Sequence, residues 1–155
     1  ERLEHLLRSH LKTDSRNCTL LFLALHTGAR AQELLNLRNK DMDPYEETIL
    51  IRGIKGSNDR EVPLPSCLFR EAMNCRAGGD LAFPISYNRL RQIWQLYRPT
   101  PKKFHSLRHT FAIRLYKKTK DIRLLQVALG HRNITNTMIY ADYVYSQQEL
   151  KKLIL

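Results

Sequence analysis

The residues most suited to chemistry lie between positions 103 and 140. His105 and Arg108 stand in the segment FHSLRHT, His131 follows a glycine in LGH, and Tyr140 comes nine residues after His131. A guanidinium fork and imidazole N–H groups can bind the non-bridging oxygens of a phosphate. A tyrosine hydroxyl beside them could attack the phosphorus as a nucleophile. The spacing therefore suggests a phosphate site.

Helical spacing separates the side chains of the FHSLRHT segment. His105 and Arg108 are three residues apart and share one face of a helix, whereas His109 lies on a different face from Arg108. We expect His109 to be structural or to support a residue of the site. His131 follows Gly130 at a helix end, where an imidazole can simply cap carbonyl groups.

The nucleophile is chosen from three neighbouring tyrosines, Tyr140, Tyr143 and Tyr145. A tyrosine on a short helix is more often a packing residue than a nucleophile. The nine-residue distance from His131 favours Tyr140 over the other two.

Three residues in the first half of the chain could complete such a site. Arg30 follows a buried helix and a glycine stop in TGARAQEL, and Glu33, three residues on, could hold it. Lys55 lies in a loop between two predicted strands. Taken singly, Arg30 fits a surface arginine at a helix start, and Lys55 fits a lysine in an ordinary turn. Their meaning comes from their combination with the later motifs.

The charge balance indicates a polyanionic partner. Twenty-six Lys and Arg residues stand against fifteen Asp and Glu residues, for a formal net charge of +11, and nucleic acid is the usual partner of so basic a domain. Three cysteines without a CxxC pair predict neither a disulfide framework nor a zinc site. No apolar run reaches the length of a membrane span, and we expect a cytoplasmic protein without a membrane partner.

The hydrophobic pattern predicts an α+β fold that is mostly helical. Two strands, 48–51 and 61–64, flank a turn-rich loop and predict a small antiparallel sheet. Pro63 and Pro65 indicate that the second strand is an edge strand or ends early. Residues 41–44 predict a turn. Helices are expected over residues 1–11, 18–26, 33–37, 66–76, 86–98, 105–118, 121–129, 135–140 and 146–155.

The order of these motifs resembles the tyrosine recombinases, also called the phage integrase family. TGARAQEL, the hairpin IKGSNDREVPL, HSLRHTFA, LGH and then Tyr140 follow one another as in that family, over residues 1–145. The joint spacing of HSLRHT, LGH and the tyrosine is the most specific part, and the hairpin lysine is the least. The resemblance implies the fold of the DNA breaking-rejoining enzymes.

The resemblance assigns the cationic residues to the phosphate. Arg30 and Arg108 match the two arginines that bind the non-bridging oxygens of the scissile phosphate and the charge that develops there. Lys55 matches the hairpin lysine that protonates the departing 5′ oxygen. His105 matches the histidine that assists proton movement at the tyrosine and binds the phosphate. His131 matches a hydrogen-bond donor to the phosphate.

The remaining positions also match. Tyr140 matches the nucleophile, which forms a 3′-phosphotyrosyl link and leaves a free 5′-hydroxyl, and Glu33 matches an acidic residue that buttresses the site. A phosphotyrosine conserves the energy of the phosphodiester bond, so rejoining needs no ATP. Cationic side chains can supply the electrostatic stabilisation that two metal ions supply in nucleases. We therefore expect no metal and no cofactor.

The resemblance also sets expectations for domains and partners. We expect residues 1–155 to be a single catalytic domain, without the N-terminal helical domain that clamps DNA in the family. The expected partner is double-stranded DNA, on which the family assembles as tetramers. The amphipathic segment 146–155 could pack on its own domain or on a neighbouring protomer. Asp142 stands where relatives often have histidine.

Two other functions fit part of the sequence. A type IB topoisomerase that relaxes supercoils shares the chemistry but acts as a monomer without a partner site. A DNA-binding protein could keep the fold without catalysis, although every catalytic position holds the expected residue type. The motifs favour a site-specific recombinase over both.

Overall fold

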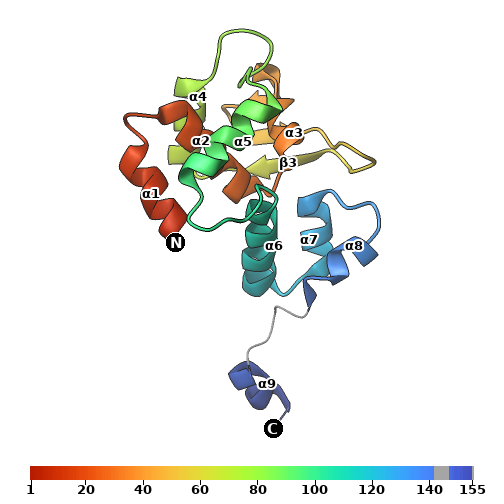
Figure 1. Cartoon of the computed structure of the whole chain (residues 1–155). Helices are drawn as coiled ribbons and strands as arrows, with labels where there is room; N and C mark the ends of the chain where they lie inside the picture. Colours follow the sequence, from red (N-terminus) through yellow and green to blue (C-terminus); the bar gives the residue numbers. More distant parts are fainter. Residues whose placement is uncertain (142–146, 155) are drawn as a thin grey trace.

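The computed structural model describes residues 1–141 and 147–154 as a mostly helical α+β fold with one small antiparallel sheet (Figure 1). This confirms the predicted fold class. The elements in chain order are α1 (Arg2–His10), α2 (Ser15–Thr27), α3 (Ala31–Leu35), the 3-10 turn η1 (Asn39–Asp41), β1 (Met42–Asp43), β2 (Thr48–Ile51), β3 (Arg60–Pro63), α4 (Ser66–Cys75), α5 (Tyr87–Tyr97), α6 (Ser106–Thr119), α7 (Ile122–Leu129), α8 (Thr135–Met138) and α9 (Gln147–Ile154).

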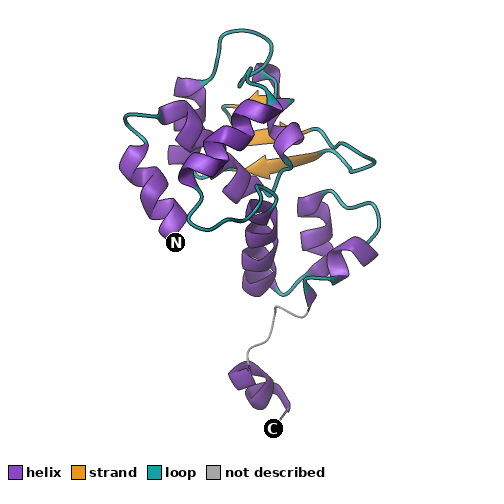
Figure 2. Cartoon of the chain, in the orientation of Figure 1, coloured by secondary structure: helices purple, strands orange, loops and turns teal. Residues whose placement is uncertain are grey.

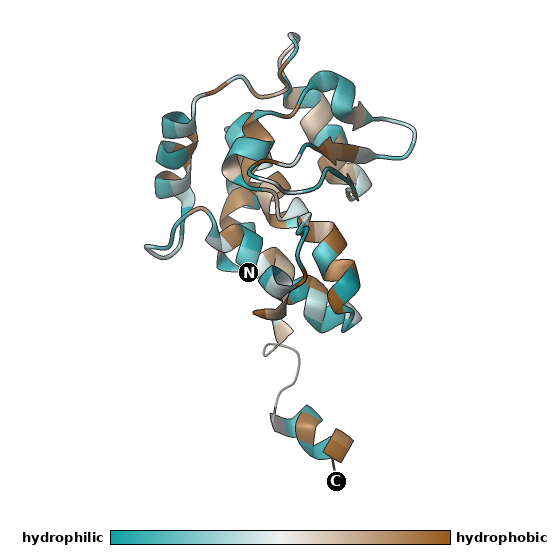
Figure 3. Cartoon of the chain, turned by 90° about the vertical axis from the view of Figure 1, so that its right-hand side faces the viewer, coloured by the Kyte–Doolittle hydropathy of each residue, from teal (hydrophilic) through white to brown (hydrophobic). Residues whose placement is uncertain are grey.

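Helix α2 is the centre of the larger hydrophobic core. Its sequence is apolar nearly all round, and the side chains from Asn17 to Leu25 are all buried, as expected of a helix enclosed on every side. It packs against α1, α4 and α6. Gly28 ends it with a left-handed φ of 66°. Figure 3 shows brown hydrophobic segments gathered inside this part of the molecule.

The sheet has the strand order β1–β2–β3, with both pairs antiparallel (Figure 2). Strand β3 is an edge strand that ends at Pro63, as the prolines predict. Strand β1 was not predicted, because the turn begins later than the sequence suggests. Met42 pairs with Ile49, and Asp43 then accepts a hydrogen bond of 2.8 Å from the backbone N–H of Tyr45.

Helix α6 joins the larger core to a second, smaller one. Its Leu107 belongs to the first core, whereas Ala112 belongs to a cluster with Leu125, Leu129 and Tyr140. In Figure 1, α6, α7 and α8 lie together below the sheet. The two halves of the predicted site therefore come from different hydrophobic clusters, and they meet along α6.

Helix caps fix where the neighbouring helices begin. The Ser86 hydroxyl accepts a hydrogen bond from the Arg89 N–H at the start of α5 (3.1 Å), and Asp121 accepts one from Leu124 at the start of α7 (3.0 Å). Both caps confirm the predicted helix starts. Gly130 ends α7 with a φ of 73°.

Residues 142–146, which precede helix α9, lie outside the described residues. They include Asp142 and the alternative nucleophiles Tyr143 and Tyr145. The Lys120 ammonium and the Glu149 carboxylate stand 4.0 Å apart, while Leu153 and Ile154 are largely exposed. Packing of α9 in cis or in trans stays a prediction. In the part of the chain that is described, no helix is long and apolar enough to cross a membrane.

Candidate active site

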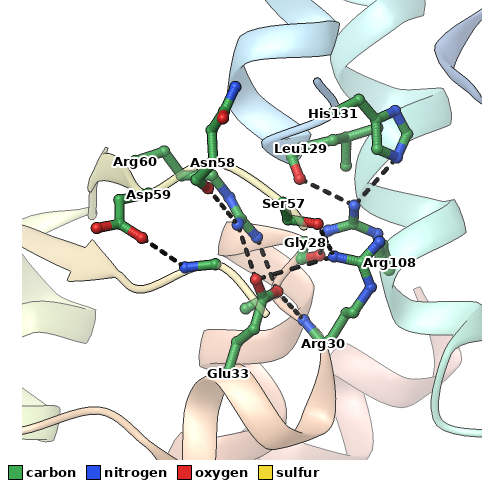
Figure 4. Close-up of polar contacts among 12 residues, drawn as sticks. Gly28, Arg30, Glu33, Ser57, Asn58, Asp59, Arg60, Arg108, Leu129 and His131 are labelled. Carbon is green, nitrogen blue, oxygen red and sulfur yellow. Dashed lines mark hydrogen bonds and ion pairs between the residues drawn. The ribbon is translucent and has the colours of Figure 1, made fainter. Parts of the chain in front are cut away.

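Arg30 lies at the turn between α2 and α3. Its backbone N–H donates to Glu33 Oε1 at 2.8 Å, which fixes the first turn of α3. Its guanidinium donates to the Ser57 hydroxyl at 2.6 Å and stands 3.9 Å from Glu33 Oε2. The side chain stays about a quarter exposed. Arg30 is therefore held in place while part of its side chain remains open to a ligand. Figure 4 shows Arg30 beside Glu33 and Ser57.

Glu33 is fully buried and pairs with Arg60, an arginine outside the sequence motifs. Arg60 donates to both carboxylate oxygens, at 2.9 and 3.0 Å. Burial alone raises the pKa of the Glu33 carboxyl, but the Arg60 guanidinium and the Arg30 N–H outweigh it, so the pKa falls below its ordinary value. Glu33 is thus the anionic centre that holds two arginines.

Arg60 connects this centre to the second half of the chain. Its Nε donates to the carbonyl of Ala128 in α7 at 3.1 Å. The sequence held a usable signal for it, because strand alternation places Arg60 on the same buried face as Val62. An inward-facing charge in a strand requires a buried partner, and Glu33 supplies it.

Arg108 is the largest fully buried side chain described. It donates to the carbonyls of Gly28 at 2.7 Å and Leu129 at 2.9 Å, one from each half of the chain. Burial, together with the charges of the nearby Arg30 and Arg60, lowers the pKa of Arg108 to about 10. Gly28 permits this geometry, because a Cβ there would collide with the Phe111 ring of α6.

His131 sits against Arg108 as a neutral imidazole. An Arg108 N–H lies 3.2 Å from Nε2, and Nδ1 lies 2.8 Å from the Thr137 hydroxyl. A guanidinium has no acceptor, so Nε2 must accept and Nδ1 carries the proton. Burial and the charge of Arg108 lower the pKa of His131 to about 4. Donation from Nε2 to a phosphate would require this nitrogen to leave Arg108 and gain a proton.

A cleft of about 490 Å³ brings three of the predicted residues together: Arg30, Lys55 and His105 all line it. Its wall also carries Arg91, Arg98 and Lys103, and no carboxylate among the described residues lines it. The cleft is therefore strongly cationic and suits a polyanion.

The loop between β2 and β3 carries Lys55 and docks on the turn after α7. The Asn58 N–H donates to the Gly130 carbonyl at 2.8 Å, and Arg132 donates to the Asn58 side chain at 3.2 Å. Lys55 lies at the exposed tip of the loop, with a left-handed φ of 51°. The docking holds the loop base while the lysine stays free to reach a ligand in the cleft.

Tyr140 does not line the cleft. Only 3% of the residue is exposed, and its hydroxyl lies 2.7 Å from His109 Nδ1. The ring of His105 stands at 84° to that of His109, with centroids 4.9 Å apart. The residue that His109 contacts is thus the predicted nucleophile, Tyr140, and the ring of His105 contacts that of His109.

These residues form a site that can bind and polarise an anion. Arg30 and Arg60 pair with the Glu33 carboxylate, and Arg108 lies close enough for its charge to act on Glu33; in the described ranges 1–141 and 147–154 no carboxylate pairs with Arg108. Nor do those ranges contain a group of three or more His, Cys, Asp or Glu side chains placed to hold a metal ion. The fixed guanidinium donors suit a group that develops negative charge.

The sequence of this chain is similar to a known protein family and to several curated proteins. A model of the phage integrase family matches residues 1–76 and 83–147. The tyrosine recombinase XerA of Thermococcus kodakarensis is 32% identical over 174 aligned positions, which cover 99% of this chain and 62% of that protein. The tyrosine recombinase XerD of Mycobacterium tuberculosis is 33% identical over 147 positions, which cover 81% of this chain and 47% of that protein.

Solved structures share the fold. The catalytic domain of bacteriophage HP1 integrase superposes with a TM-score of 0.74 at 26% identity, covering 99% of this chain and 90% of that domain. The XerH site-specific recombinase, bound to its palindromic difH substrate in a post-cleavage complex, gives a TM-score of 0.74 at 29% identity, covering 99% of this chain and 51% of XerH. The chain spans about half to two thirds of the curated relatives that it matches.

Proposed function

This chain belongs to the phage integrase family, and we propose that it is the catalytic part of a site-specific tyrosine recombinase. It cuts one DNA strand at a time through a 3′-phosphotyrosyl intermediate and rejoins it to a new partner. Neither ATP nor a metal ion enters this scheme, because the bond energy stays in the phosphotyrosine and guanidinium groups supply the positive charge.

The observation that carries the proposal is the buried charge of Arg108, which no carboxylate of the described residues pairs with. Its guanidinium is held by the Gly28 and Leu129 carbonyls and by His131. A buried cation without an anion is costly, and the lowered pKa of Arg108 expresses that cost. A scissile phosphate would supply the missing negative charge, most strongly in the transition state, where more charge develops.

The other residues have separate roles around that phosphate. Arg30 reaches it from the cleft side, where its guanidinium is partly open. Lys55, at the loop tip, protonates the departing 5′ oxygen. His105, on the cleft wall, contacts the phosphate, and His131 donates to it after releasing Arg108. Tyr140 is the nucleophile, and Glu33 holds Arg30 and Arg60 in position.

Double-stranded DNA is the proposed partner. Its backbone would follow the cationic cleft, since Arg91, Arg98 and Lys103 extend the wall beyond Arg30 and Lys55. XerH, a relative in structure, is bound to its difH substrate. We further propose that copies of the protein assemble as a tetramer on paired sites, which recombination of two duplexes requires.

The proposal is tested with a library of nicked duplexes that have a randomised core. Cleavage beside a nick releases a short fragment and traps the protein on DNA, and sequencing of the trapped duplexes gives the preferred site. We expect a covalent band on a denaturing gel, formed in the presence of EDTA, that Tyr140→Phe abolishes. Arg108→Ala should abolish it too while most duplex binding persists, because other backbone contacts dominate affinity.

Other outcomes would replace the proposal. Duplex binding without a covalent band from any library member would indicate a DNA-binding protein without catalysis. Relaxation of supercoiled plasmid by a monomer, with no strand exchange between two duplexes, would indicate topoisomerase-like action. A band that survives Tyr140→Phe and disappears in Tyr143→Phe would show that Tyr140 is not the nucleophile.

A further inference from the structure

We propose that His109 is the base that takes the proton from Tyr140 when the tyrosine attacks the phosphate. This inference rests on the proposed function, and it goes beyond the role that the sequence motif gives to His105. The Tyr140 hydroxyl lies 2.7 Å from His109 Nδ1, within the reach required of a general base. A general base must accept here, so the proposal assigns the phenol as donor and Nδ1 as acceptor, with the imidazole proton on Nε2.

The placement of His105 favours this assignment. His105 lines the cationic cleft together with Arg30 and Lys55, where a phosphate oxygen would lie. Its ring makes an edge contact with the ring of His109, and the ring of His109 in turn lies against that of Tyr140. Partial burial lowers the pKa of His105, and His109 and Arg108 lower it further. His105 is therefore suited to contact the phosphate rather than the phenol.

His109 also connects a buried hydroxyl to solvent. Tyr140 is 3% exposed, whereas His109 is exposed and lines a second cleft of about 820 Å³, which His105 does not line. The charged groups that face His109 across this cleft are Arg2, Glu4, Lys102 and Arg114, together with Glu1. Glu4 and Arg114 pair with each other at 2.7 Å. A proton taken from Tyr140 can leave through this cleft.

The proposed step balances in protons and bonds. The phenolic O–H bond breaks, and its proton goes to His109 Nδ1. The phenolate oxygen forms a bond to phosphorus as the bond from phosphorus to the 5′ oxygen breaks. The departing oxygen receives a proton from Lys55. In the rejoining step, His109 returns its proton to the Tyr140 oxygen, and Lys55 takes one from the attacking 5′-hydroxyl.

The decisive experiment compares His109→Ala and His109→Asn with the wild type on the duplex selected from the library. Asparagine places an amide near the position of Nδ1, so it can hold the hydroxyl but cannot accept its proton. We expect both variants to cleave about 100-fold more slowly, in the range for loss of a general base. The defect of His109→Ala should shrink as the pH rises, because solvent then removes the phenolic proton.

A sulfur substitution separates the two ends of the reaction. In a duplex with a 5′-bridging phosphorothiolate, the departing thiolate needs no proton. Sulfur should therefore rescue Lys55→Ala but not His109→Ala. Unchanged circular dichroism and thermal midpoints exclude misfolding as the cause of any loss, and His109 is exposed enough for substitution to be tolerated.

Three results would overturn the inference and leave the proposed function intact. These are wild-type rates in His109→Ala while Tyr140→Phe is inactive, wild-type rates in His109→Asn, and rescue of His109→Ala by sulfur. The second would show that His109 only positions the tyrosine, and the third would place it at the leaving group. If the wild type itself forms no covalent product, the proposed function fails, and this inference fails with it.

Discussion

Glu33 is the carboxylate among Arg30, Arg60 and Arg108. Glu33→Gln should therefore lower the free energy of unfolding, because the repulsion between these arginines is no longer offset. Its carboxylate is fully buried and receives two hydrogen bonds from Arg60, which is itself 3% exposed at the side chain. Removal of one partner from such a buried pair costs about 3–5 kcal/mol, because the other charge stays buried without compensation. Glutamine keeps the volume and one acceptor oxygen, so we expect the lower end of this range.

The reciprocal variant should cost less. In Arg60→Met the carboxylate keeps the Arg30 N–H at 2.8 Å and the Arg30 guanidinium at 3.9 Å. In Glu33→Gln, by contrast, Arg30, Arg60 and Arg108 repel one another with no carboxylate between them. The free energy of unfolding, extrapolated from urea titrations with the slope m fitted separately, measures the difference.

A half-exposed pair provides the comparison. Arg52 donates to the buried Asp41 carboxylate at 2.8 Å, but the Arg52 side chain is 42% exposed. Asp41 also keeps a hydrogen bond from the Arg38 N–H at 3.2 Å, so Arg52→Met should change the free energy of unfolding less than either buried variant. The charge argument is wrong if Arg60→Met destabilises the protein more than Glu33→Gln. It is also wrong if Glu33→Gln costs less than about 1 kcal/mol, the scale of an exposed pair.

Two further predictions concern the loop and the pH. Gly130→Ala should destabilise the protein and slow cleavage, because at a φ of 73° the new Cβ would lie 2.7 Å from the Asn58 carbonyl oxygen. Gly56→Ala is the control: its φ is 78°, but the nearest atom to its Cβ is 4.0 Å away, so it introduces backbone strain without a collision. Equal losses of stability in urea titrations would contradict this reasoning. The pKa of His131 is about 4 in the folded protein and ~6.5 in the unfolded chain, so the unfolded chain binds the proton first and stability falls as the pH drops from ~6.5 towards 4. His131→Gln should flatten this part of the stability curve, and an unchanged slope would show that His131 does not cause it.

The sequence is sufficient to predict the position of a residue in the fold where residue type and local spacing alone determine that position. Arg30 follows a helix that Gly28 must end, and His105 and Arg108 share a helix face, so their positions follow from local geometry. Lys55 follows from the two strands that flank its loop. Local rules could not reveal which distant groups meet, such as Arg108 with the carbonyls of Gly28 and Leu129.

Arg60 and His109 show what tertiary packing adds. Strand alternation marks Arg60 as an inward-facing charge, but its partner Glu33 lies 27 residues earlier and only the folded chain brings them together. His109 faces away from Arg108 on α6, which suggested a supporting role. Its partner Tyr140 could not be named from that face, because the contact depends on how α7 and α8 pack against α6.

The same contacts explain why the site needs both halves of the chain. Arg108 can stay buried and charged only because one carbonyl from the α2 turn and another from the end of α7 accept its hydrogen bonds. Arg60 repeats this connection, since it pairs with Glu33 of α3 and donates to Ala128 of α7. A shift of α7 away from the sheet would therefore release two arginines and the Lys55 loop at once. We therefore expect phosphate binding and the packing of α7 to be coupled. The phosphate would supply negative charge to Arg108, and α7 supplies carbonyl acceptors to Arg108 and Arg60.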